Sequence, residues 1–222
     1  MTLSLWLSLL GASALISFTP GAGAINTMTN SLNAGFRRSI WGIFGQQAAL
    51  VAHVVIVAAG VGLLVSGSPV AFTTIRYAGA AYLVFLGVRL FLDKPRAGAA
   101  HWEAAVQEAA VRAPGRGESG WTESGWSMFR RGLWVNLLNP KAIVFFLAFT
   151  PQFVRPGEPL LPQYAVLIAT VVAVDILVMW FFFAAAAKSV RRFTRGTRGQ
   201  LVLNRTFGTL FILVAALLAF VH

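Results

Sequence analysis

One apolar stretch, residues 131–153, constrains the fold more than any other feature of the sequence. It is long enough to cross a bilayer, whose core of about 30 Å takes roughly 20 apolar residues as a helix. Its interior nevertheless contains Asn136, Asn139, Pro140 and Lys141. Proline removes a helix hydrogen bond. Such a break is tolerated inside a membrane only where protein or a water-filled cavity can satisfy the backbone groups that lose their partner. We therefore expect a broken membrane helix that carries a polar site near mid-membrane.

The composition indicates an integral membrane protein. The chain is 57% hydrophobic and 11% charged, with a mean hydropathy of +0.72, whereas a soluble domain is about 25% charged. The absence of cysteine excludes disulfides, thiol redox chemistry and thiolate metal sites. None of the three histidines has a metal-ligand spacing, so no metal or cofactor is expected. The net charge of +11 lies mainly in short loops, which favours an orienting role at the membrane over nucleic-acid binding.

The uncharged residues 1–36 predict a first membrane helix with an internal break. We expect this helix to cover 5–29 and to stay attached, because a secretory signal begins with basic residues and none precedes Arg37. Proline and glycine within a helix predict a kink or an unwound turn. The predicted hinge residues of the two broken helices are Pro20, Gly21, Gly23 and Pro140.

The fold class predicted from these patterns is an all-α membrane protein with six transmembrane helices in a single domain, residues 1–222. Of the 18 Lys and Arg residues, 15 lie in or beside the first, third and fifth connections between these helices. The positive-inside rule then places both termini outside the cytoplasm. The predicted spans are 5–29, 41–65, 72–92, 131–153, 162–187 and 203–221.

An internal repeat divides the chain into two predicted halves, 1–92 and 128–222, around a cytoplasmic loop, 93–127. Three helices per half force opposite orientations, so the repeat is inverted. Transporters of this kind bind substrate near mid-membrane, at broken helices in corresponding positions. Three features recur at offsets of 120–129 residues: Pro20 with Pro140, His53 with Asp175, and Arg76-x-x-Gly79 with Arg205-x-x-Gly208.

Three stretches together resemble the LysE/RhtB family of amino-acid exporters. They are Thr-Pro-Gly-Ala-Gly-Ala-Ile-Asn-Thr-Met-Thr at 19–29, Ala-Ala-Tyr-Leu-Val-Phe-Leu-Gly at 80–87, and Asn-Leu-Leu-Asn-Pro-Lys-Ala-Ile-Val-Phe-Phe at 136–146 with Pro-Gln-Phe at 151–153. The run that follows Pro20-Gly21 looks like the branch for homoserine and homoserine lactone. The resemblance implies proton-coupled export of a small amino acid across the bacterial inner membrane. It leaves the substrate open, since related exporters take threonine, leucine or lysine.

Three ionisable side chains are the leading candidates for chemistry, because charges inside a membrane are costly. Lys141 is interpreted as a counter-ion for the substrate carboxylate, as one half of a structural ion pair, or as a long side chain that snorkels to an interface. Asp175 is interpreted as a proton-coupling carboxylate or a partner for the substrate ammonium, or as a fixed pair with Lys141 or His53. His53 is interpreted as a proton relay, or as a hydrogen-bonded packing residue.

Several polar side chains are predicted to line the pathway and bind the substrate, or else to join helices by hydrogen bonds. A passive channel remains an alternative, as does an intramembrane enzyme or electron carrier, although the lack of Cys and of paired His argues against the latter. Protons, membrane lipids and a second copy of the chain are the remaining expected partners. The predicted pathway residues are Asn26, Thr27, Asn30, Gln46, Gln47, Asn136 and Asn139.

Overall fold

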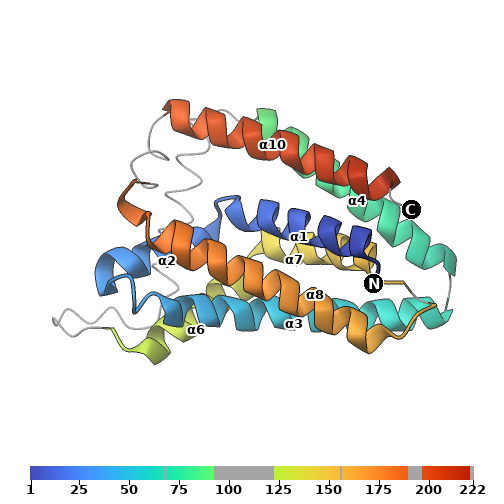
Figure 1. Cartoon of the computed structure of the whole chain (residues 1–222), viewed down its shortest axis with the longest axis horizontal. Helices are drawn as coiled ribbons and strands as arrows, with labels where there is room; N and C mark the ends of the chain where they lie inside the picture. Colours follow the sequence, from blue (N-terminus) through green and yellow to red (C-terminus); the bar gives the residue numbers. More distant parts are fainter. Residues whose placement is uncertain (68, 93–122, 156, 190–196, 221–222) are drawn as a thin grey trace.

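The chain forms helices, and no strand, throughout the part that the structure describes. The structure is a computed structural model that describes residues 1–67, 69–92, 123–155, 157–189 and 197–220 (Figure 1). Most of the predicted loop 93–127 lies outside the described residues.

The first apolar segment is broken at the predicted place. It forms α1 (Leu3–Phe18) and α2 (Ala22–Ala34), which are bent by 59° relative to each other. Pro20 lacks the N–H that a continuous helix needs, and Gly21 is extended as the N-cap of α2. The Thr19 hydroxyl donates to the carbonyl of Leu15 at 2.9 Å, so the end of α1 is satisfied locally. The single kinked span expected over 5–29 is thus two helices.

The second broken segment forms α6 (Gly125–Leu137) and α7 (Pro140–Phe149), followed by a 3₁₀ turn, η1 (Thr150–Phe153). Proline is favoured as the first residue of a helix, where its missing N–H has no intrahelical partner. Ser124 caps α6, since its hydroxyl accepts from the N–H of Ser127 at 3.1 Å. Helix α6 therefore begins at Gly125, three residues before position 128, where the second half was predicted to start.

The remaining helices lie close to their predicted positions, with one unexpected feature. The predicted helix over 162–187 ends its α-helical part at Leu177 and continues as a π-helical segment, η2. Such segments are rare and often lie at functional sites. The Ser31 hydroxyl donates to the carbonyl of Ala184 at 2.6 Å and so satisfies the end of η2. The elements are α3 (Ile40–Gly67), α4 (Pro69–Leu92), α8 (Leu160–Leu177), η2 (Val178–Ala184) and α10 (Thr197–Phe220).

The helices run between two ends of the molecule (Figure 1). At the 35–39 end, α2 turns into α3, α4 and η2 finish, and α6 and α10 begin. At the 154–159 end, α1 begins, α3 turns into α4, η1 leads into α8, and α10 finishes. The start of α1 and the end of α10 therefore lie at the same end of the molecule (Figure 1).

Length and composition identify fewer membrane spans than the sequence predicts. Among the described residues, Ile40–Gly60 and Leu160–Ala184 are long and apolar enough to cross a membrane, and α1 with α2 qualify together as a bent pair. That makes two spans, or three with the bent pair. The six-span count and the inverted repeat remain predictions.

Two hydrophobic clusters form the core, and each draws on both halves of the chain. Cluster A packs α1 and α3 against α7, η1 and α8, and includes Leu5, Leu9, Leu50, Val54, Phe145, Phe149, Phe153, Leu167 and Val171. Cluster B packs α2 and α3 against η2, and includes Ala24, Met28, Ile43, Val178, Met179 and Phe183.

Helices α4 and α10 pair through glycine (Figure 1). A Cβ on Gly87 would lie 2.8 Å from the carbonyl oxygen of Gly208, and a Cβ on Gly208 would lie 2.7 Å from that of Gly87. Small residues let membrane helices approach this closely. Gly208 belongs to the predicted Arg-x-x-Gly repeat, but its partner across the contact is Gly87 rather than the repeat residue Gly79.

Candidate functional site

Asp175 lies at the centre of the candidate site. Its carboxylate accepts a hydrogen bond from the Ser17 hydroxyl at 2.9 Å and another from the Gln47 amide nitrogen at 2.6 Å. The three residues come from α8, α1 and α3, and Ser17 stands three residues before the break at Pro20. Of the seven acidic residues, Asp175 alone falls within a predicted span. A carboxylate is therefore held between the two predicted halves of the chain.

The site lies between the two hydrophobic clusters. Along α3, Gln47 follows Ile43 of cluster B and precedes Leu50 of cluster A. Along α8, Asp175 follows Val171 of cluster A and precedes Val178 of cluster B. The same order holds for Ser17, between cluster A residues of α1 and cluster B residues of α2. The carboxylate thus lies between the two apolar clusters along each of these helices.

Helix α3 also satisfies the backbone beside the break in the first segment. The side-chain amide of Gln46 donates to the carbonyl of Gly23 and to the hydroxyl of Thr27, each at 3.1 Å. Gly23 has little room for a side chain, because a Cβ there would lie 3.0 Å from Oε1 of Gln46. The predicted hinge glycine and the predicted pathway residue Thr27 are therefore linked through Gln46.

Helix α3 also makes hydrogen bonds beside the break in the second segment. The Asn136 amide donates to the backbone carbonyl of Gln46 at 3.0 Å. His53 Nε2 lies 3.2 Å from the carbonyl of Leu137, close to the break at Pro140. The His53 ring stacks on Phe146 with centroids 5.9 Å apart. These contacts match the packing interpretation of His53, and the relay interpretation stays a prediction.

Two further predicted residues, Asn139 and Lys141, lie at this break. Asn139 directly precedes α7, and its carbonyl accepts from the N–H of Ile143 at 3.0 Å. Lys141 is the second residue of α7, and its side chain lies outside the described part of the structure. Its role as a counter-ion stays a prediction.

A second polar cluster was not predicted. Arg131 of α6 donates through Nε to Oδ1 of Asn26 at 3.1 Å and through Nη2 to Oδ1 of Asn30. Its Nη1 pairs with Oε1 of Glu123 at 2.6 Å, and the side chains of Arg131 and Glu123 are 17% and 30% exposed. The Arg38 guanidinium donates to the backbone carbonyl of Glu123 at 2.7 Å. The cluster lies at the 35–39 end of the molecule.

Some of the residues that the structure brings together were predicted as pathway residues, and others were not. Gln47 was predicted and contacts Asp175, and Asn26 and Asn30 were predicted and meet at Arg131. Arg131 was counted only as a charge that orients the protein, and Glu123 only as part of the loop. Ser17 was missed, although a serine three residues before a membrane proline was a usable signal.

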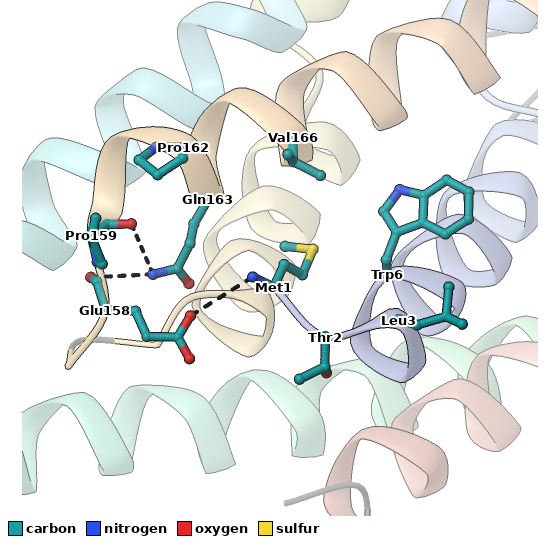
Figure 2. A pocket seen from close by; sticks show the side chains of 9 residues that line it. All are labelled: Met1, Thr2, Leu3, Trp6, Glu158, Pro159, Pro162, Gln163 and Val166. Atoms are coloured by element: carbon teal, nitrogen blue, oxygen red, sulfur yellow. Dashed lines mark hydrogen bonds and ion pairs between the residues drawn. The ribbon is translucent and has the colours of Figure 1, made fainter.

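A pocket lies away from these residues, at the 154–159 end (Figure 2). It has a volume of about 550 Å³ between the start of α1 and the start of α8. Figure 2 shows Trp6 and Val166 beside it, and the Gln163 side chain turned toward the carbonyl of Pro159, to which it donates at 3.1 Å. None of the predicted site residues lines it.

Paired broken helices around a buried polar site are typical of membrane transporters. The chain belongs to the LysE family, because the family model described as LysE type translocator matches residues 14–221. It is therefore a transport protein and not an enzyme.

Named relatives extend over nearly the whole chain. A homoserine/homoserine lactone efflux protein of Salmonella typhimurium is 41% identical, covering 99% of this chain and 98% of the relative. An uncharacterized membrane protein of Vibrio cholerae is 35% identical over the same shares. A leucine efflux protein of Salmonella typhimurium is 29% identical, covering 98% of this chain and 95% of the relative. No solved structure has significant similarity to the chain.

Proposed function

We propose that the protein exports small amino acids from the cytoplasm in exchange for protons, with homoserine and homoserine lactone as the main substrates. The 41% identity to a homoserine/homoserine lactone efflux protein over 99% of the chain supports this choice. Threonine, which is close to homoserine in size and polarity, is the next candidate. The bacterial inner membrane is the proposed location, with both termini outside the cytoplasm.

The proposed architecture is six spans in two inverted halves, 1–92 and 128–222. The broken segments α1–α2 and α6–α7 each count as one span, and α3, α4, α8 with η2, and α10 supply the others. The breaks at Pro20 and Pro140 then occupy corresponding places, and helix ends at such breaks bind charged groups of substrates. Exposed apolar side chains such as Leu161 and Leu213 would face lipid or a second copy of the chain.

The Asp175 carboxylate carries the proposal. When ionised, it accepts bonds from Ser17 and Gln47 of the first half. A protonated carboxyl group has one O–H donor and less accepting capacity, so uptake of a proton would weaken at least one of the two bonds. Protonation at Asp175 would thereby loosen the contact between the halves. This links proton binding to alternating access.

The function is tested by transport in liposomes that contain the purified protein. Homoserine loaded inside should leave faster when an imposed pH gradient supplies protons for exchange, and a protonophore should remove the acceleration. Protein-free liposomes are the control. Efflux that is independent of the gradient would identify a passive channel instead.

Lys141 is proposed to bind the substrate carboxylate near mid-membrane. We expect Lys141→Met to weaken homoserine binding by on the order of tenfold or more, as loss of a charged hydrogen bond does. Lys141→Arg should also bind weakly, because a planar guanidinium does not replace a compact ammonium in a tight site. Equilibrium binding to purified protein measures both variants. Lys188→Met is the matched control because Lys188 is exposed, and unchanged affinity in Lys141→Met would remove Lys141 from the site.

A further inference from the structure

We propose that Arg131, together with Asn26 and Asn30, forms a loading site for the substrate carboxylate, and that Glu123 occupies this site as an internal carboxylate until substrate displaces it. The inference rests on the proposed function and adds to it a first substrate-binding site at the 35–39 end. The argument starts from the arginine, which is largely buried, with 17% of its side chain exposed.

The guanidinium is held rigidly from one side. Its Nε and Nη2 donate to the amide oxygens of Asn26 and Asn30, which stand one turn apart on α2. Both asparagines are almost fully buried, at 3% and 1% exposure. The two amides therefore fix the plane of the guanidinium and leave Nη1 to meet a further acceptor. Arginine held in this way is suited to carboxylates, whose geometry matches its planar fork.

The site has more donors than acceptors. The side-chain oxygens of Asn26 and Asn30 accept from Arg131, so their NH₂ groups point away from the guanidinium. Both Nδ2 atoms are buried without a hydrogen-bond partner among the described residues. Both face Gly42 of α3, where a Cβ would lie 3.4 Å from Nδ2 of Asn26 and would overlap Nδ2 of Asn30. An unpaired buried donor costs about 1–3 kcal/mol. These two Nδ2 atoms lie against Gly42, so an anion that replaces Glu123 would pair with Nη1 of Arg131.

The Glu123 carboxylate is placed so that a substrate carboxylate can replace it on Arg131. It precedes the cap of α6, outside the helix, and its side chain is 30% exposed. Arg131 and the Ser127 hydroxyl both bond the same oxygen, Oε1, at 2.6 and 2.9 Å. No described residue donates to Oε2, so within the described part of the chain the carboxylate is bonded only through Oε1. A free amino-acid carboxylate has the same chemistry and can use both oxygens.

The position of Arg131 suits the first substrate-binding site on the export path. Arg131 lies on α6 and Lys141 is the second residue of α7, so the break between the two helices separates them. In the proposed orientation the 35–39 end faces the cytoplasm, because Arg37 and Arg38 stand there. Substrate would meet Arg131 first and Lys141 afterwards.

Opposite effects from the two members of one ion pair test the proposal. Glu123→Gln removes the competitor, so the KM for homoserine export should fall by on the order of three- to tenfold. Arg131→Gln removes the binding group, so the same KM should rise by roughly tenfold or more. Arg131→Lys should give an intermediate KM. Homoserine lactone lacks a free carboxylate, so its KM should change little in any of these variants.

Glu158→Gln is the control. Glu158 pairs with Arg155 at 3.4 Å, with both side chains about 40% exposed, at the other end of the molecule. Its removal should leave both KM values unchanged. A purely structural Arg131–Glu123 pair would instead shift KM and melting temperature in the same direction in both variants, or affect homoserine and its lactone equally, and either result overturns the loading site. If wild-type protein exports neither compound, the proposed function itself fails.

Discussion

Asp175→Asn is expected to abolish uphill export and to leave counterflow exchange of substrate partly intact. Asparagine cannot exchange a proton, so the step that couples transport to the proton gradient is lost. The fold should survive, because Oε1 of Gln47 is buried without a partner among the described residues. Rotation of the Gln47 amide by half a turn would let Oε1 accept from the new Asn NH₂ group, while the Asn oxygen still accepts from Ser17.

Two measurements on the same liposomes separate coupling from binding. Efflux of homoserine driven by a pH gradient should fall to the protein-free level, whereas exchange of labelled for unlabelled homoserine should continue. Ser17→Ala is the companion variant, because it removes one hydrogen bond to Asp175 but keeps the ionisable carboxyl group. It should slow uphill export without abolishing it. Uphill export that survives in Asp175→Asn would show that the proton is carried elsewhere.

Gly132→Val is expected to prevent correct assembly of α6 against α3. A Cβ on Gly132 would overlap the backbone carbonyl of Gly42, and a Cβ on Gly45 would overlap that of Phe129. Overpacking costs typically 1–3 kcal/mol when side chains can shift, and here the obstacle is backbone, so we expect more than about 3 kcal/mol. The yield of monodisperse protein in detergent and its melting temperature measure the loss.

Gly60→Val is the matched control, because Gly60 lies on α3, the helix that α6 packs against, but a Cβ there meets nothing within 4 Å. It should leave yield and melting temperature close to those of the wild type. Gly132→Ala is a milder test of the same contact. It should lower the melting temperature and weaken homoserine export as well, because residue 132 directly follows Arg131. Equal stability of the variants at residues 132 and 60 would contradict the close α3–α6 contact.

The two breaks were predictable from local sequence. Pro20 and Pro140 act on their own turn of helix, since each lacks an N–H group and crowds the preceding turn. The structure interrupts the helices at both prolines. The π-helical segment η2 was not predictable in this way, because no proline or glycine occurs between Val178 and Ala184.

The pairing of side chains between helices was harder to predict. In a soluble helix an apolar stripe shows which face is buried, but α8 is apolar on nearly every side. The sequence therefore identified Asp175 as a costly charge and Gln47 as a pathway residue, but it did not show that Gln47 and Ser17 would both bond to Asp175. The contacts of Arg131 were not predicted for a related reason, since its partners Asn26 and Asn30 lie 105 and 101 residues away in the sequence.

The sequence by itself determined the class of protein, the helical architecture and the places where helices break, because these follow from local composition and from the covalent limits of proline. Only the tertiary structure decided which polar groups meet. It placed the Asp175 carboxylate between two apolar clusters and the Glu123 carboxylate against Arg131. Those contacts depend on how each helix is rotated and packed, and the nearly uniform apolar surface of a membrane helix leaves that rotation unmarked.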